Sequence, residues 1–311
     1  MLKQNIIGTI GNTPLVRLNR IYTNQLINIY AKLEYFNPGG SIKDRTALYM
    51  INEAEKEGKL KEGSTIIEPT AGNTGIGLAL VASQKGYKTI FVVPERFSLE
   101  KQVLMKALGA EIINTPTGEG MEGAIKKATE INKDIENSII LQQFSNPSNT
   151  KAHYEMTAPE IYNALEGKID IFVAGIGTGG TFMGISKYLK EKIHGLYAVA
   201  VEPQGSILGK KEAGRHKIEG IGVDNLETTK LIDFSLIDEV FTVKDEDAHK
   251  TLKELAKLEG ILAGSSSGAA CFAATEIAKR FKTANIVTLF PDSSERYLTK
   301  NIYGKLEEWK Y

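Results

Sequence analysis

The sequence predicts an α/β protein with parallel-rich sheets in two domains. Strand-like and helix-like segments alternate along nearly the whole chain, as in folds that are built from βαβ units. Several of the strand candidates are continuous runs of Ile, Val and Phe, which is the pattern of parallel strands buried on both faces. The chain has 311 residues, more than one hydrophobic core usually serves, so two domains are expected.

The strand candidates share this apolar character and are bounded by turn or helix signals. They are Ile27–Leu33, Thr65–Glu68, Thr89–Val93, Glu111–Asn114, Ile139–Gln142, Ile171–Ala174, Tyr197–Glu202, Glu239–Val243 and Ile286–Phe290. Helix ends are predicted at Ser98 and Asp245, as N-caps, and at Gly109 and Gly260, as the glycines that follow a helix. The segment 205–229 is rich in Gly, Lys and Glu, and we predict a long, mobile loop of the kind that often covers a site.

Composition excludes several classes of function. Lys and Arg together number 38, as do Asp and Glu, so the net charge of zero gives no reason to expect nucleic acid or an anionic membrane as a partner. The single cysteine, Cys271, excludes an internal disulfide and a Cys-x-x-Cys metal site, and we expect a buried, inert thiol. No signal peptide or membrane-spanning run is visible, so a cytoplasmic location is expected.

One turn carries a candidate nucleophile. The stretch Asn37-Pro38-Gly39-Gly40-Ser41-Ile42-Lys43-Asp44-Arg45 follows a predicted strand and precedes a helical pattern, with Ser41 as a plausible N-cap. Lys43 then lies in the first helical turn, where the helix dipole disfavours an ammonium and burial lowers the pKa further. Such an amine can form a Schiff base. The alternative is an ordinary solvated surface lysine.

Four glycine-rich elements are interpreted as lying directly after strands, where α/β folds bind ligands. They are the Lys43 turn, Glu68–Gly75, Gly175–Thr181 and Leu262–Gly268. All four mix Gly with Ser, Thr or Asn, so we expect one crevice lined by backbone N–H groups and hydroxyls. That lining suits an anionic ligand with a phosphate or carboxylate group.

The third of these elements also fits a dinucleotide-dependent oxidoreductase. Gly175-x-Gly177-x-x-Gly180 matches the dinucleotide fingerprint, and Glu202 ends the next predicted strand, where a ribose-binding acid would lie. However, Gly179 and the two flanking threonines favour a cup around a single phosphate. A dinucleotide would also leave the other three loops without a role.

Metal and triad chemistry have little support. The four histidines, His153, His194, His216 and His249, are scattered without a ligand-like spacing, and His153 is interpreted as a helix-face residue. No Gly-x-Ser-x-Gly elbow is present. A lysine facing a phosphate cup, with neither metal nor triad, indicates pyridoxal phosphate.

The motifs in combination resemble the pyridoxal-phosphate β-replacement enzymes, namely cysteine synthase and the catalytic core of cystathionine β-synthase. The resemblance runs from Ile10-Gly11-Asn12-Thr13-Pro14-Leu15 to Phe290-Pro291-Asp292-Ser293. It implies a fold type II enzyme, similar to the tryptophan synthase β chain, with the cofactor in the cleft between its domains. A smaller, mobile domain would span residues 41–146, and a larger one, carrying the phosphate cup, residues 1–40 and 147–311. A homodimer is also implied.

The resemblance gives the glycine-rich loops their roles. Lys43 would bind pyridoxal 5'-phosphate as a Schiff base and then act as catalytic base, Asn73 would hold the ring hydroxyl, and Ser266 would hydrogen-bond the pyridine nitrogen. The phosphate would lie in the cup formed by Gly177, Thr178, Gly179, Gly180 and Thr181. The amino-acid substrate would be bound by Thr70, Ala71, Gly72, Asn73, Thr74, Gln143 and Gly220. A neutral hydroxyl at the pyridine nitrogen weakens the electron sink, which favours β-elimination over transamination.

The implied reaction is β-replacement on O-acetylserine, serine or cysteine by sulfide or homocysteine, giving cysteine or cystathionine. Ala71 stands where cysteine synthases usually have serine, and Asp224 follows Gly220 and Gly222 in a loop that usually carries glycine instead of the acid. Both departures look like the O-acetylserine-dependent cystathionine synthase branch, where Asp224 would be a second catalytic group that serves the acceptor. The alternatives are release of hydrogen sulfide from cysteine at the same site, the dinucleotide oxidoreductase, and a non-catalytic ligand-binding protein.

Overall fold

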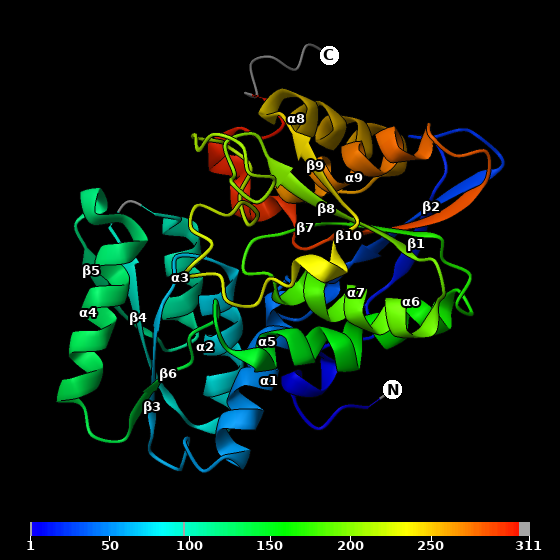
Figure 1. Ribbon diagram of the computed structural model, residues 1–311. Coiled ribbons are helices and arrows are strands. Elements are labelled where there is room, and N and C mark those ends of the chain that lie inside the picture. The colour runs from blue at the N-terminus through cyan, green and yellow to red at the C-terminus, as the bar shows by residue number, and fades with distance from the viewer. Residues whose placement is uncertain (1, 96, 305–311) are drawn as a thin grey trace. The chain divides into compact units, whose positions relative to one another are not determined.

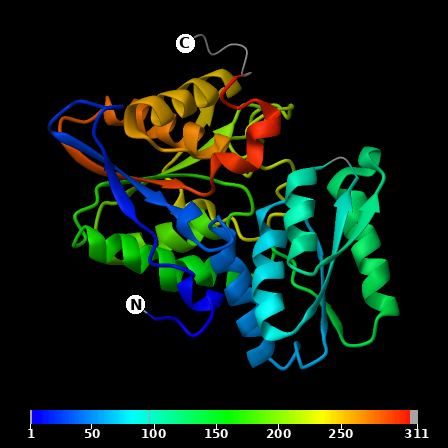
Figure 2. The same ribbon diagram turned by 180° about the vertical axis from the view of Figure 1, so that it is seen from behind.

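The computed structural model describes residues 2–95 and 97–304, and it divides into two α/β units. The first unit comprises the chain up to Gly11 together with Asn37–Ala152, and the second comprises Asn12–Phe36 and the chain from His153 onwards. Figure 1 shows the course of the chain through each unit, and Figure 2 shows the reverse side.

The first unit is wider in sequence than the predicted span of 41–146. Its 3₁₀-helix η1 (Ile6–Thr9) packs on α2 (Asn73–Lys85), and the N–H of Gly11 donates to the side chain of Asn37 at 2.8 Å. At the other boundary, α5 (Pro147–Ala152) packs on α1 (Lys43–Lys56). These local contacts assign the first residues and α5 to the first unit.

A parallel sheet of order β5-β4-β3-β6 forms the centre of the first unit. Its strands are β3 (Thr65–Pro69), β4 (Lys88–Pro94), β5 (Glu111–Thr115) and β6 (Ser138–Ile140). Besides α1, α2 and α5, the unit contains α3 (Leu99–Ala107), α4 (Gly120–Asp134) and η3 (Thr117–Glu119). Ala124 and Ala128 of α4 pack on Ile67 and Val92 of the sheet. Because side chains alternate along a strand, the neighbouring Phe91, which is fully buried, faces the opposite side.

The second unit is built on a larger sheet of order β1-β2-β10-β7-β8-β9. All of its strand pairs are parallel except β1 with β2. Its strands are β1 (Leu15–Leu18), β2 (Ile27–Leu33), β7 (Ile171–Gly175), β8 (Tyr197–Pro203), β9 (Glu239–Val243) and β10 (Ala284–Phe290). The helical segments are η2 (Glu34–Phe36), η4 (His153–Thr157), α6 (Ala158–Ala164), α7 (Gly180–Lys192), η5 (Phe234–Leu236), α8 (Asp245–Glu254), η6 (Leu255–Glu259), α9 (Ser265–Ala278) and η7 (Ser294–Lys300).

Helices cover both faces of this larger sheet, with α8 and α9 on one face and α6 and α7 on the other (Figure 1). The small side chains of α9 allow close packing, and a side chain at Gly268 would collide with the backbone of α8. Cys271 of α9 is fully buried, and burial raises the pKa of its thiol, which confirms the expectation of a buried thiol. On the other face, the rings of Phe172 and Phe182 pack with centroids 5.5 Å apart.

The predicted strands are confirmed, with Ile27–Leu33 and Glu239–Val243 matched at both ends. The predicted end of Ile139–Gln142 is corrected, because β6 stops at Ile140 and Gln142 has a left-handed backbone. Strand β1 was not predicted, because it is short, partly exposed and antiparallel at the sheet edge. The side-chain caps are corrected: Ser98 has a left-handed backbone and makes no cap hydrogen bond. Asp245 is the first residue of α8, after the cap residue Lys244.

Most of the segment predicted as a long loop, 205–229, is irregular. Buried side chains tie it to the second unit, among them Leu208, Ile218, Ile221 and Val223. Within the described residues, no helix is both long and apolar enough to cross a membrane.

Candidate active site

The Lys43 turn lies at the start of α1 in the first unit. The N–H of Gly39 donates to the carboxylate of Asp44 at 2.6 Å, and a side chain at Gly39 would collide with that carboxylate. Gly40 has a φ of 73°, in the left-handed region that glycine adopts without strain. Ser41 precedes the cap residue Ile42, yet its hydroxyl accepts the N–H of Lys43 at 3.3 Å. The two glycines therefore fold the turn tightly onto the first residues of the helix.

Lys43 is the first residue of α1 and is partly buried. Burial lowers the pKa of its amine to about 8, so near neutral pH a far larger fraction is neutral and nucleophilic than for an ordinary lysine. Behind it, α1 and α2 pack so closely that a Cβ at Gly77 would lie 2.8 Å from the carbonyl oxygen of Lys43. Glycine at position 77 therefore permits this packing.

The second glycine-rich loop, Thr70–Thr74, joins β3 to the first turn of α2 in the same unit. Thr70 and Thr74 are buried, whereas Ala71, Gly72 and Asn73 are partly exposed. The Thr74 hydroxyl donates to the side-chain Oε1 of Gln143 at 2.6 Å. This hydrogen bond joins the loop to Gln143, so the structure brings together two segments that were predicted to bind the substrate.

Sequence reasoning missed Glu68, which lies at the end of β3 just before this loop. Its side chain is buried and accepts hydrogen bonds from the backbone N–H groups of Leu141, Gln142 and Gln143. The signal was an acid in an otherwise apolar strand, since all of β3 is buried.

The third glycine-rich loop, in the second unit, joins β7 to the first turn of α7. Gly179 has a φ of 90°, and a Cβ at Gly177 would lie 2.7 Å from the carbonyl oxygen of Gly220. The loop therefore needs glycine at both positions. Gly180 begins α7, so the unpaired N–H groups of its first turn open onto this loop.

Thr181 of this loop is held by a buried histidine, a second residue that sequence reasoning missed. His153 lies in the π-helix η4, with its Nε2 3.2 Å from the Thr181 Oγ1 and its Nδ1 3.0 Å from the Thr157 Oγ1. The interpretation as a helix-face residue omits this contact, because a sequence pattern does not show which side chains meet across a fold.

The loop that carries Gly220 and Asp224 packs beside the phosphate-cup candidate in the same unit. The N–H of Gly222 donates to the carbonyl of Ile176 at 2.8 Å. The N–H of Glu219 donates to the Ser265 hydroxyl at 3.0 Å. Asp224 lies just beyond these contacts and is exposed.

Ser266 lies in the first turn of α9 and is buried. Its neighbour Ser267 has a buried hydroxyl for which the described residues offer no hydrogen-bond partner. The start of α9 therefore places buried hydroxyls at a helix N-terminus.

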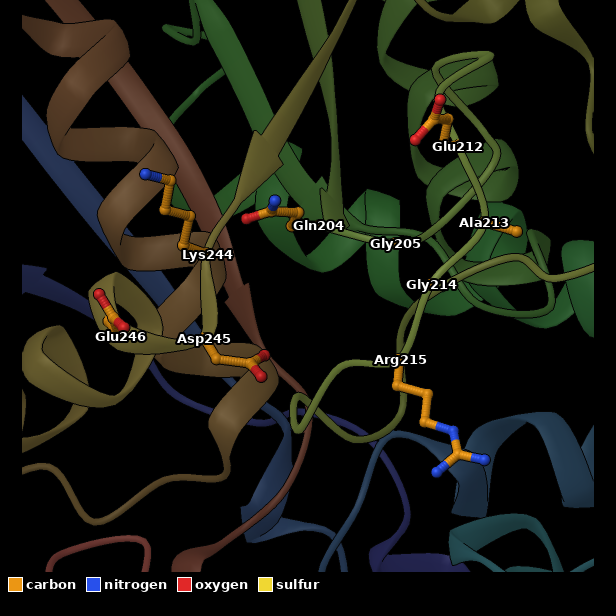
Figure 3. Close-up of a pocket in the computed structure, with 9 residues that line it drawn as sticks. All are labelled: Gln204, Gly205, Glu212, Ala213, Gly214, Arg215, Lys244, Asp245 and Glu246. Carbon is orange, nitrogen blue, oxygen red and sulfur yellow. The ribbon is translucent and has the colours of Figure 1, made fainter.

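The second unit also contains a hollow of about 590 Å³ on the segment that follows β8 (Figure 3). It is lined by residues of that segment and of the start of α8: Gln204, Gly205, Glu212, Ala213, Gly214, Arg215, Lys244, Asp245 and Glu246. The Asp245 carboxylate accepts the backbone N–H of Lys217. None of the predicted site residues lines this hollow. In the part of the chain that the structure describes, no group of three or more His, Cys, Asp or Glu could hold a metal ion.

Comparison with known proteins decides between the candidate classes. Residues 6–292 match the family described as pyridoxal-phosphate dependent enzyme. This chain belongs to that family. The dinucleotide oxidoreductase and the non-catalytic binding protein are thereby set aside.

Individual members of this family resemble the chain over nearly its full length. An O-acetylserine dependent cystathionine β-synthase of Bacillus subtilis is 52% identical over 300 residues, covering 96% of this chain and 97% of that protein. A cysteine synthase of Helicobacter pylori is 51% identical over 306 residues, covering 97% and 99%. The crystal structure of O-acetylserine dependent cystathionine β-synthase from Helicobacter pylori superposes with a TM-score of 0.90 at 49% identity, covering 97% and 99%.

These findings confirm the predicted fold type II architecture, the cofactor and the enzyme class. The chain is a pyridoxal-phosphate-dependent enzyme of the cysteine synthase and cystathionine β-synthase type. Two features of the residues fit the cofactor. Lys43 offers an amine of lowered pKa, and the loop before α7 has no side chains at Gly177, which packs against the carbonyl of Gly220, or at Gly179, which packs against Ile232.

Proposed function

We propose that the enzyme replaces the β-substituent of O-acetylserine with a sulfur nucleophile, giving cystathionine from homocysteine and cysteine from sulfide. The observation that carries this proposal is the lowered pKa of the Lys43 amine in the first turn of α1. It is made in a chain that is similar both to an O-acetylserine dependent cystathionine β-synthase and to cysteine synthases. Serine and cysteine are further candidate donors.

Lys43 has two roles in this proposal. Its neutral amine binds the cofactor covalently, and once released by the incoming amino acid it removes the proton from the substrate Cα. A pKa of about 8 suits both roles, because a base works best when its pKa lies near the working pH. Bound pyridoxal phosphate supplies the electron sink that stabilises negative charge at that carbon.

The cup in the second unit binds the cofactor phosphate. Backbone N–H groups from Gly177 to Gly180 and the hydroxyls of Thr178 and Thr181 are its donors, at the positive end of α7. Asn73 holds the ring hydroxyl, and Ser266 accepts or donates a hydrogen bond at the pyridine nitrogen without adding charge. The neutral partner favours loss of the β-substituent over transamination.

The loop Thr70–Thr74 and Gln143 bind the substrate carboxylate. Their N–H, hydroxyl and amide donors already lie close together, as the hydrogen bond from Thr74 to Gln143 shows, and charge-assisted bonds to a carboxylate are the strong ones. Because residue 71 is alanine and not the usual serine, it places no hydroxyl beside the reacting carbon. The missing hydroxyl makes room for an acceptor larger than sulfide. Gly220 lines the substrate, and Asp224 serves the amino group or the thiol of homocysteine.

Purified protein loaded with pyridoxal phosphate tests this function. O-acetylserine should yield cystathionine with homocysteine and cysteine with sulfide, as measured by chromatography of the amino-acid products. A protein that leaves O-acetylserine intact with both acceptors would contradict the proposal. Release of sulfide from cysteine as the only activity would assign the same site to cysteine breakdown.

The homodimer rests on the family resemblance, and the cytoplasmic location remains the expectation from the sequence. Analytical ultracentrifugation of the purified holoenzyme should give twice the chain mass of 34.1 kDa. Fractionation of the source cells should recover the enzyme in the cytoplasm. A monomer would contradict the first expectation, and recovery of the enzyme from another compartment would contradict the second.

A further inference from the structure

We propose that Glu68 is a positioning residue that fixes the Gln143 segment in the shape that binds the substrate carboxylate. This inference rests on the proposed function, since it assigns Glu68 to the carboxylate clamp of that site. All residues concerned lie in the first unit.

The carboxylate of Glu68 holds three consecutive backbone amides. Its Oε2 accepts from Leu141 at 3.1 Å and from Gln142 at 3.0 Å, and its Oε1 accepts from Gln143 at 3.1 Å. The residue is 1% exposed. Successive N–H groups that converge in this way form an anion-binding concavity, so here the protein supplies its own anion.

The segment needs such a partner because of its backbone. Strand β6 ends at Ile140, and Gln142 has a φ of 59°, in the left-handed region that non-glycine residues seldom adopt. The bend turns three N–H groups away from the β-ladder, and buried N–H groups require acceptors. Glu68 provides them from the neighbouring strand, so the bend and the carboxylate depend on each other.

The bend in turn places the Gln143 side chain. Its Oε1 accepts the Thr74 hydroxyl at 2.6 Å, which leaves the amide N–H donors to meet a ligand. Its carbonyl accepts the side chain of Asn149 at 2.9 Å. Glu68 therefore acts on the substrate carboxylate through Gln143, without touching it.

An ionised carboxylate suits this place best, because both of its oxygens accept hydrogen bonds. An amide at position 68 would present an NH₂ group to N–H donors, with no lone pair in that direction. Burial raises the pKa of Glu68 more than the three N–H bonds lower it, to a net value of about 7, so these hydrogen bonds are what keeps the ionised form accessible in a buried site.

The test compares Glu68→Gln with the wild-type holoenzyme in sulfide-dependent turnover of O-acetylserine and of its carboxamide. Glu55→Gln is the matched control, because Glu55 is a partly buried acid in the same unit whose partners, Lys85 and Tyr87, lie outside the clamp. We expect Glu68→Gln to raise KM for O-acetylserine about tenfold, the effect of one charge-assisted hydrogen bond. The kcat should change less than about threefold, and the carboxamide kinetics should not change.

A loss of kcat at constant KM, or an equal rise of KM for both substrates, would overturn the positioning role. Hydrogen exchange of the wild-type protein keeps the proposal testable if the variant does not fold. The amides of residues 141–143 should exchange as slowly as those of β3, although they lie outside a strand, and fast exchange would also overturn the proposal. If wild-type protein does not turn over O-acetylserine, the proposed function fails, and the exchange result still reports on Glu68.

Discussion

His153 and Thr181 meet across the second unit, where the Nε2 of the buried imidazole lies 3.2 Å from the threonine hydroxyl. The other ring nitrogen lies 3.0 Å from the Thr157 Oγ1. The histidine thus connects the π-helix η4 to the first turn of α7 and sets the direction of a hydroxyl that we assign to the cofactor phosphate.

Replacing His153 should therefore weaken cofactor binding. His153→Leu removes both hydrogen bonds and leaves Thr181 free to rotate, and a typical hydrogen bond contributes about 1 kcal/mol. We expect pyridoxal phosphate to dissociate about five- to tenfold more readily, measured by absorbance titration of cofactor-free protein. His153→Gln, which can still bond Thr181, should lose less, and equal losses in both variants would show that the contact does not matter.

The pKa of Lys43 also predicts how the stability of the cofactor-free protein depends on pH. Burial lowers this pKa from 10.5 to about 8. At pH 7 folding therefore buries a charged ammonium, which lowers the free energy of unfolding. Above pH 8 the folded state releases this proton while the unfolded state still holds it, so the cost disappears as pH rises towards 10.5. Lys43→Met should be more stable than wild type at pH 7 by on the order of 2 kcal/mol, allowing for partial exposure of the side chain.

Urea unfolding of both cofactor-free proteins at pH 7 and pH 10 measures this difference, and the comparison cancels every other titrating group. The advantage of Lys43→Met should be much smaller at pH 10. An advantage that is the same at both pH values would show that the Lys43 amine has an ordinary pKa in the folded state.

Asp224 should distinguish between acceptors. If its carboxylate serves the amino group or the thiol of homocysteine, Asp224→Asn should slow cystathionine formation about tenfold, the effect of one charge-assisted contact. Cysteine formation from sulfide should change little, since sulfide has no amino group. Competition between the two acceptors, followed by product analysis, measures the ratio, with Glu227→Gln, another exposed acid of this segment, as the control. An equal loss with both acceptors would refute an acceptor-binding role.

The sequence predicted most of the sheet architecture, because parallel strands buried on both faces are continuous apolar runs. Ile27–Leu33 and Ile171–Ala174 are examples. The glycine-rich loops were found by their Gly, Ser, Thr and Asn residues together with their position, but the fourth, Leu262–Gly268, follows the π-helix η6 instead of a strand. The edge strand Leu15–Leu18 was missed, since it is half exposed and has no apolar run. The predicted side-chain cap at Ser98 was also wrong, because Ser98 adopts a left-handed backbone and makes no cap hydrogen bond.

The parts of the site that the sequence did not reveal depend on contacts between distant segments. Glu68 meets residues 141–143 across neighbouring strands, and His153 meets Thr181 only because η4 packs on α7. Local patterns report which residues form a helix or strand. They do not report which side chain of one element reaches the backbone or hydroxyl of another.

The measurement that tests the central claim most directly locates the covalent attachment of pyridoxal phosphate. Borohydride reduces the carbon–nitrogen double bond between a lysine and the cofactor to a stable amine, so the modified peptide can be identified by mass spectrometry. The account predicts one modified lysine, Lys43, and in Lys43→Ala it predicts no modification and only reversible cofactor binding. Attachment at another lysine, or near-normal turnover by Lys43→Ala, would contradict it.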